Sequence, residues 1–136
     1  MLKMLYFFIL LKTARSDWKY KKISNRYVIY ILLLVFVQML CSQQLSIAER
    51  MTAALMFSLP MLLISCIKFG AFGGGDIKFV AVNALLLGID DMLYAMWIAG
   101  LTASIYALFL LCIHKNKREI FAFGPFLAFG FGIAYL

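Results

Sequence analysis

The chain has 136 residues, of which 65% are hydrophobic and 14% charged, and its mean hydropathy is +0.97. So few polar side chains cannot cover a water-soluble globule, and the composition therefore predicts an integral membrane protein. The net charge of +7 does not indicate a nucleic-acid partner, because the basic residues form short clusters between apolar runs and not one basic face.

Six apolar runs follow one another, and each is expected to form a transmembrane helix of a single domain covering residues 1–136. The runs cover residues 1–16, 27–41, 51–67, 79–89, 92–113 and 120–136. The first is short for a bilayer, which needs roughly 20 residues of helix. It is not followed by the small-x-small cleavage site of a secretory signal. The predicted fold class is therefore all-α, with six transmembrane helices.

Polar segments separate these runs. Residues 12–26 form a predicted basic turn with Trp18 and Tyr20 at headgroup level, and residues 42–50 form a polar loop. Pro60 is expected to bend the third helix. The fourth run is only about 16 Å long as a helix, so either the helix begins in the preceding glycine stretch or its end lies in a thinned or water-filled part of the bilayer. Asp90 and Asp91 are expected in a solvated loop after it.

The charges agree with these six spans. Eleven basic residues fall on one side, and only Lys3 and Arg50 fall on the other. The larger group consists of Lys12, Arg15, Lys19, Lys21, Lys22, Arg26, Lys68, Lys78, Lys115, Lys117 and Arg118. Basic loops face the cytoplasm, so this asymmetry predicts that both termini lie outside.

No metal or cofactor is expected. Cys41, Cys66 and Cys112 lie far apart, form no C-x-x-C pair, and are interpreted as small buried hydrophobic residues. The only histidine, His114, ends an apolar run beside basic residues, where an interfacial cation is the favoured interpretation.

The glycine stretch Gly73, Gly74 and Gly75 precedes Asp76, Ile77 and Lys78, and it interrupts the apolar pattern. Glycines permit positive φ and a close approach of another chain, so this loop is a candidate for substrate binding. An aspartate that opens a helix usually caps the first-turn N–H groups, and Asp76 alone indicates no more than that. Lys78 is either an electrostatic partner of Asp76 or an interfacial anchor.

Asp17 is a second carboxylate at a predicted membrane boundary. Two complete spans separate Asp17 from Asp76, and an even number of crossings returns the chain to the same side. The two side chains meet if the first and fourth spans pack side by side. Ionisable groups at membrane depth mark functional sites, and two close carboxyls share one proton, which raises one apparent pKa. An aspartic protease uses that state: one carboxylate takes a proton from water and the other carboxyl donates to the peptide carbonyl.

These residues resemble the aspartic prepilin peptidases, or type IV leader peptidases, and their archaeal preflagellin relatives. Residues 73–78 match the G-x-G-D-x-K motif of the family. The segment from Asp17 to Asn25 is similar to its second motif, an Asp, a basic stretch and Ile-Pro-Asn, with Ser24 in place of the proline. Residues 123–128 are like the Phe-Gly-Pro-Phe segment of the last span.

The resemblance implies that Asp17 and Asp76 are the catalytic pair. It implies cleavage of the short leader of a prepilin-like or pseudopilin substrate at the cytoplasmic face of the inner membrane. Bifunctional members of the family also methylate the new N-terminus, using an additional region with a cysteine-bearing cytoplasmic loop. The first cytoplasmic loop here is short and has no cysteine, so peptidase activity alone is expected.

Two alternatives stay open at the level of sequence. A presenilin-like G-x-G-D protease that cuts within transmembrane segments normally has Tyr-Asp inside a span, whereas Asp17 follows Ser16 in a basic turn. A non-enzymatic membrane subunit or small transporter would use the carboxylates for coupling or structure. Transporters commonly show repeated halves, and the chain has no convincing internal repeat.

Overall fold

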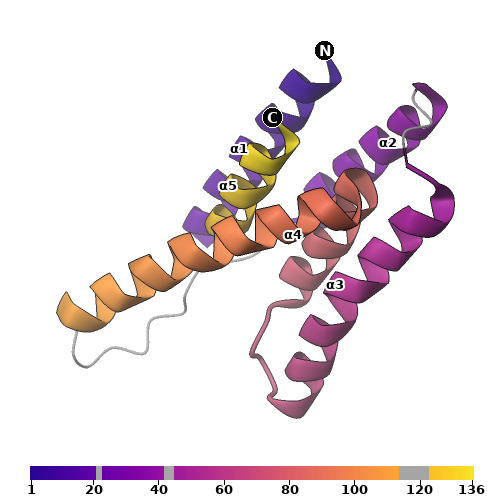
Figure 1. Ribbon diagram of the computed structural model, residues 1–136. Coiled ribbons are helices and arrows are strands. Elements are labelled where there is room, and N and C mark those ends of the chain that lie inside the picture. The colour runs from indigo at the N-terminus through magenta and orange to yellow at the C-terminus, as the bar shows by residue number, and fades with distance from the viewer. Residues whose placement is uncertain (21–22, 42–44, 114–122) are drawn as a thin grey trace.

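The computed structural model describes residues 1–20, 23–41, 45–113 and 123–136. These residues form five helices and no strand, so the all-α prediction is confirmed for this part of the chain (Figure 1). The helices are α1 (Leu2–Tyr20), α2 (Asn25–Cys41), α3 (Ile47–Ile67), α4 (Gly74–Ile113) and α5 (Gly124–Tyr135). The predicted basic cluster at residues 115–118, His114 and the start of the sixth run lie outside the described residues.

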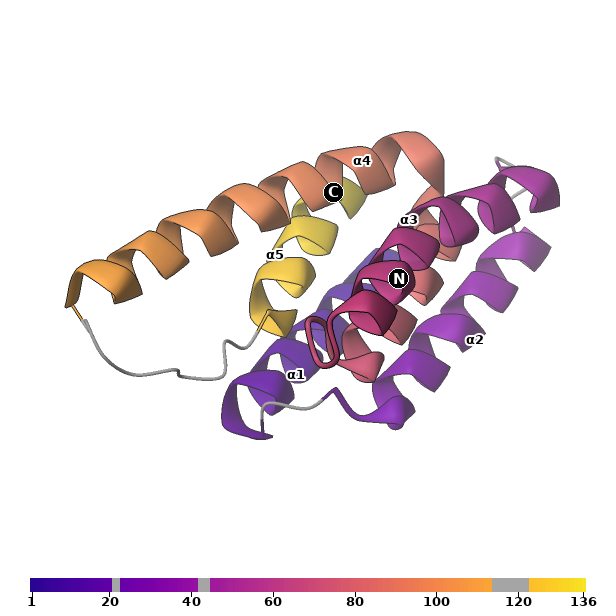
Figure 2. The same cartoon turned by 90° about the horizontal axis from the view of Figure 1, so that it is seen from below.

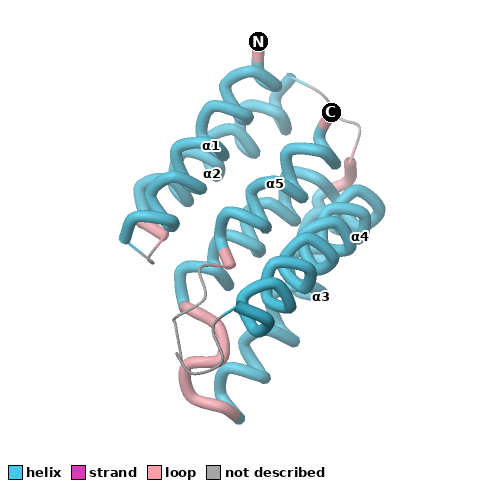
Figure 3. The backbone as a smooth tube through the Cα atoms, turned by 90° about the vertical axis from the view of Figure 1, so that its left-hand side faces the viewer, coloured by secondary structure: helices cyan, strands magenta, loops and turns pink. Residues whose placement is uncertain are grey.

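Helix α4 is the centre of the arrangement. It packs against α3, α5 and α2, while α1 packs against α5 and α2. Figure 3 shows α1 beside α5, with both chain ends at the same end of the molecule. Seen from below, the second half of α4 crosses α5 and extends away from α2 and α3 (Figure 2). The core lies where α4 meets α5, and there the rings of Phe79 and Phe131, both fully buried, lie 5.5 Å apart.

The helix starts follow from local sequence. Ser46 is the N-cap of α3 and its hydroxyl accepts a hydrogen bond of 3.1 Å from the Glu49 N–H, the Ser-x-x-Glu pattern of a capping box. Helix α3 therefore begins earlier than expected, and residues 47–50 are helical and not part of a loop. Pro125 stands in the first turn of α5, where a missing N–H removes no intrahelical bond.

Two further boundaries differ from the prediction. Helix α1 continues to Tyr20, so Asp17 lies in its last turn and not in a turn beyond it. Helix α4 begins at Gly74, which is the first of the two alternatives left open for the short fourth run. Asp90 and Asp91 are exposed, as expected, but they are helical and not in a loop.

A break at Gly88 divides α4 into two helical pieces. Gly88 has φ 81° and ψ −173°, a conformation that is essentially restricted to glycine. Carbonyls in the last turn before such a break lack intrahelical donors. Arg50 supplies one, since its Nη1 group donates a 2.8 Å hydrogen bond to the Leu85 carbonyl. Arg50 was predicted to end the polar loop of residues 42–50, and it lies instead in α3 with 2% of its surface exposed.

Large apolar side chains remain exposed on the outer faces, among them Phe36 at 62%, Trp97 at 70% and Leu111 at 69%. Such surface suits lipid and not water. By length and composition, α3 and α4 can each cross a membrane, and α2 and α5 are apolar but shorter. Cys41, Cys66 and Cys112 are exposed and unpaired, so the expectation that they are buried is wrong.

Candidate active site

Asp17 is held by the start of α5. Tyr6, Leu10, Thr13 and Asp17 recur every three or four residues and form the buried face of α1. The Asp17 side chain is 4% exposed, and its Oδ2 atom accepts a 2.9 Å hydrogen bond from the Gly124 N–H. Gly124 is the first residue of α5, where backbone N–H groups are free and favour a negative charge. Asp17 therefore caps a helix that is distant in sequence.

Gly124 must be small because of this contact. A Cβ atom added there would lie 2.7 Å from the Asp17 carboxyl carbon and 3.0 Å from its Cβ, closer than real Cβ contacts. The glycine thus lets the α5 backbone approach the carboxylate directly. In the sequence, residues 123–128 were identified only by their similarity to the Phe-Gly-Pro-Phe segment of the family. The spacing of these residues did not indicate that Gly124 contacts Asp17.

Asp76 lies in the first turn of α4 and is partly buried. The Gly73 carbonyl accepts the N–H groups of Asp76 and Ile77, at 2.9 and 3.2 Å, and the Gly73 N–H donates to the Asp76 carboxyl. The Asp76 carboxyl therefore bonds the N–H of the residue just before α4, as the third residue of a capping box does, and not an N–H group of the first turn as expected. This role does not exclude a second one, because a carboxylate has lone pairs for several partners.

The glycine stretch brings the two aspartates to one end of the molecule. A Cβ added to Gly75 would lie 3.2 Å from the backbone oxygen and Cβ of Ile23, in the segment that leads from α1 to α2. A Cβ on Gly74 would meet nothing within 4 Å. The predicted positive φ is absent from Gly73, Gly74 and Gly75, and it is found at Gly70 and Gly88. Close approach is thus the constraint at Gly75.

The pKa values of both carboxyl groups are raised by burial. Asp17 follows the apolar part of α1 and Asp76 precedes the apolar run that begins at Phe79, so both lie outside the apolar runs that would cross a bilayer. Burial raises the pKa of Asp17, and the Gly124 N–H opposes this. Burial, and to a smaller extent the charge of Asp17, raise the pKa of Asp76 to about 6, while the hydrogen bond from the Gly73 N–H lowers it. The charge of Asp17 thus acts on Asp76, although the backbones of α1 and α4 make no close contact.

A polar pocket of about 870 Å³ lies near the two aspartates, although neither of them lines it. Ser16 and Gly75, the residues directly before the two aspartates, both line it. Lys78 and Gly74 line the same pocket, so these predicted loop residues share one surface. The pocket is large enough for an extended peptide segment, and its lining comes from α1, α2 and α4.

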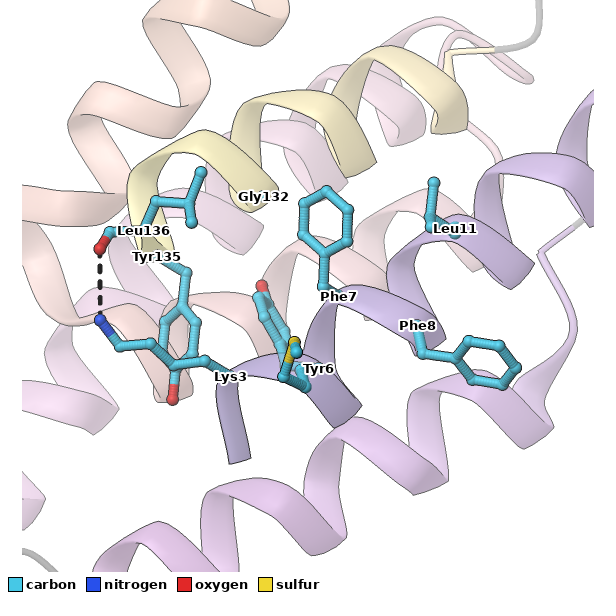
Figure 4. A pocket seen from close by; sticks show the side chains of 9 residues that line it. Lys3, Tyr6, Phe7, Phe8, Leu11, Gly132, Tyr135 and Leu136 are labelled. Carbon is cyan, nitrogen blue, oxygen red and sulfur yellow. Dashed lines mark hydrogen bonds between the residues drawn. The ribbon is translucent and has the colours of Figure 1, made fainter. Parts of the chain in front are cut away.

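A second pocket, of about 340 Å³, lies at the opposite end of α1 (Figure 4). Its lining is mostly apolar and includes Phe7, Phe8 and Leu11. It shares no lining residue with the polar pocket and lies at the far end of α1 from Asp17. Across residues 1–20, 23–41, 45–113 and 123–136, no three potential metal-ligating side chains come together.

The fold and the site define a class of protein: a helical protein with membrane-type helices, in which carboxyl groups from two helices share one electrostatic environment. Residues 4–108 match the Type IV leader peptidase family. This match covers most of the chain, and the protein therefore belongs to that family of proteases.

A relative agrees with this assignment. The prepilin leader peptidase/N-methyltransferase of Bacillus subtilis (strain 168) is 31% identical over 129 residues. The matched region covers 94% of this chain and 52% of the relative, so the chain spans about half the length of that protein. No solved structure matches the chain.

Proposed function

We propose that this protein is a membrane aspartic endopeptidase that removes the N-terminal leader of prepilin-like proteins. The observation that carries the proposal is the placement of Asp17 and Asp76 at two helix ends, where the residues directly before them, Ser16 and Gly75, line one polar pocket and the charge of Asp17 acts on Asp76. Family membership supports the leader-cleaving reaction, and the similarity to a prepilin leader peptidase/N-methyltransferase supports a prepilin substrate.

The environments of the two carboxyls assign their roles. Asp17 accepts the Gly124 N–H, which favours the ionised form, and Asp17 acts as the general base. Asp76 carries the raised pKa of about 6 and acts as the protonated general acid. Asp17 takes a proton from water as the water oxygen attacks the scissile carbonyl carbon. Asp76 gives its proton to the carbonyl oxygen. Asp17 then gives the proton it took from water to the leaving nitrogen, the C–N bond breaks, and the carbonyl re-forms as its hydroxyl proton returns to Asp76.

The pocket beside the pair receives the extended part of the substrate. Gly74 and Gly75 line it without side chains, so a peptide backbone can approach the motif closely. Lys78 lies at its exposed rim and serves as an interfacial anchor. No metal, cofactor or covalent intermediate takes part in this proposal.

The proposed membrane arrangement has six spans, with the break at Gly88 separating the fourth from the fifth. The charge asymmetry of the loops supports a cytoplasmic location of the aspartates. Lys3 Nζ donates a 3.2 Å hydrogen bond to the Leu136 carbonyl, so both chain ends lie together at the far end of α1 from Asp17. This supports two external termini and an inner-membrane site that faces the cytoplasm.

The test uses purified protein in detergent and a prepilin-like peptide, with leader release followed by mass spectrometry. Asp17→Asn and Asp76→Asn are each expected to lose at least about a thousandfold in rate, because removing either member removes proton transfer in the transition state. Asp90→Asn is the matched control, since Asp90 is exposed after the Gly88 break. Comparable cleavage by either of the first two variants would remove that residue from catalysis.

A further inference from the structure

Two uncharged side chains link the helices that carry the aspartates. Tyr6 on α1 is 1% exposed and Asn83 on α4 is fully buried. The Tyr6 hydroxyl donates a hydrogen bond of 2.5 Å to Asn83 Oδ1. Asn83 Nδ2 donates in turn to the Phe79 carbonyl at 2.7 Å, which fixes the orientation of the amide.

The Tyr6–Asn83 hydrogen bond is a direct connection between α1 and α4, whose backbones do not pack closely against each other. Helix α1 rests on α5 and α2, and α4 rests on these same helices, so a long tyrosine side chain is needed to join α1 to α4 directly. The side-by-side packing of the first and fourth spans, which was the stated condition for the aspartates to meet, is therefore absent, and the two helices are connected through side chains and through α5. In an apolar surrounding, no water molecule can take the place of either hydrogen-bond partner if the bond is lost.

The same faces carry the aspartates. Tyr6 and Asp17 lie on the buried face of α1, and Asn83 follows Asp76 by seven residues, or about two turns of α4. Measured from the Tyr6–Asn83 bond, Asp17 lies about 16 Å along α1 and Asp76 about 10 Å along α4. The helices run in opposite directions, so both distances point toward the same end of the molecule.

Side-chain direction does not change this difference of about one turn. All four side chains lean toward the N-terminus of their own helix, so the lean moves the Tyr6–Asn83 bond as well as the two carboxyl groups. A slip of α1 by one further turn, about 5 Å, in the direction that separates the aspartates would double the difference.

We propose that Tyr6 and Asn83 are positioning residues: their hydrogen bond fixes the axial register of α1 against α4 and so sets Asp17 opposite Asp76. The inference rests on the proposed function for its catalytic meaning, while the register itself is a property of the fold. Figure 4 shows Tyr6 beside Tyr135, and their ring centroids are 4.6 Å apart, so packing on α5 holds the tyrosine ring in place.

The variants are Tyr6→Phe, and Tyr6→Phe combined with Asn83→Leu. The single change leaves the Asn83 oxygen without its donor, whereas the double change removes both partners and keeps an apolar core. Tyr135→Phe is the matched control, since it removes a hydroxyl from the neighbouring ring and leaves the Tyr6–Asn83 bond intact. Monodispersity in detergent checks that each variant is folded.

The first readout does not depend on activity. Asp17→Cys and Asp76→Cys are introduced together after Cys41, Cys66 and Cys112 are replaced by alanine, and a short bifunctional thiol reagent crosslinks the pair. We expect efficient crosslinking in this background and with Tyr135→Phe, and a fall of about fivefold or more in the double variant. Unchanged crosslinking in a folded double variant would overturn the inference, whatever the catalytic outcome.

The second readout is the pH profile of leader cleavage. A misplaced pair is expected to lower kcat by about ten- to a hundredfold, with little change in KM. With Asp17 farther away, the high-pH limb that reports Asp76 shifts to lower pH, which a loss of folded enzyme alone would not produce. An unshifted limb at reduced kcat would contradict the positioning role. Full activity of Asp17→Asn would instead refute the proposed function and leave the crosslinking result standing.

Discussion

Replacing Gly124 with alanine tests whether the start of α5 holds Asp17, the proposed catalytic base. The added Cβ would lie 2.7 Å from the Asp17 carboxyl carbon and closer still to Oδ2, whereas ordinary contacts begin at 3.4 Å. The carboxyl group must therefore move by roughly 0.7 Å or more, which lengthens the hydrogen bond from the residue 124 N–H. A displacement of about 1 Å at a reacting group can lower a rate a hundredfold. We expect kcat for leader cleavage to fall ten- to a hundredfold.

Two further glycines make the result interpretable. Gly100 has nothing within 4 Å of an added Cβ and lies in a helix interior, so Gly100→Ala should keep full activity. A Cβ on Gly130 would lie 3.0 Å from the Ala99 Cβ and closer to the Ala95 carbonyl, so Gly130→Ala disturbs the contact between α5 and α4 without touching Asp17. The assay is initial rate at saturating substrate, with thermal unfolding in detergent measured in parallel. If Gly124→Ala keeps activity within twofold of the original protein, the assigned role of the Gly124 contact is wrong.

Three other predictions follow from the same structure. Cleavage should decline as pH rises through about 6, because Asp76, the proposed acid, then loses its proton. Cleavage should also decline at low pH, because Asp17, the proposed base, then gains a proton. A profile of kcat/KM against pH that lacks the decline at high pH would contradict the assignment of Asp76 as the acid. The raised pKa of folded Asp76 gives stability that is present below its unfolded pKa and lost as pH rises through about 6, so Asp76→Asn should raise the unfolding temperature more at pH 8 than at pH 4.5. Gly88→Ala should lower the free energy of unfolding by about 1–3 kcal/mol, because alanine is strained at φ 81° and its Cβ would lie 3.1 Å from the Leu45 side chain. Denaturant unfolding of Gly88→Ala, compared with that of the control Gly100→Ala, measures the difference.

Much of the arrangement could be predicted because apolar runs and punctuating residues are local signals. The described helices fall on the expected runs, and two aspartates separated by an even number of crossings were expected at one end of the molecule. The electrostatic coupling between Asp17 and Asp76 agrees with that expectation. Boundaries were less accurate, since the polar residues 12–20 and 47–50 continue helices that composition alone would end.

The partners of the site could not be predicted, because they depend on packing between distant segments. The Gly124 N–H meets Asp17 only once α5 lies against α1, and nothing in the spacing of residues 123–128 indicates this. Asn83 is a lone polar residue in an apolar run, and that signal could have marked it as a paired side chain in lipid. Arg50 was treated as a loop charge because the break at Gly88, which leaves carbonyls for it to bind, was not foreseen.

The meeting of Lys3 with Leu136 has a practical consequence for anyone who labels or tethers this protein. Asp17 follows Lys3 by fourteen residues of helix, about 21 Å along α1. A fluorophore, affinity tag or surface linker attached at either chain end would project from the far side of the bundle. Immobilised enzyme should therefore still present its carboxyl pair to added peptide.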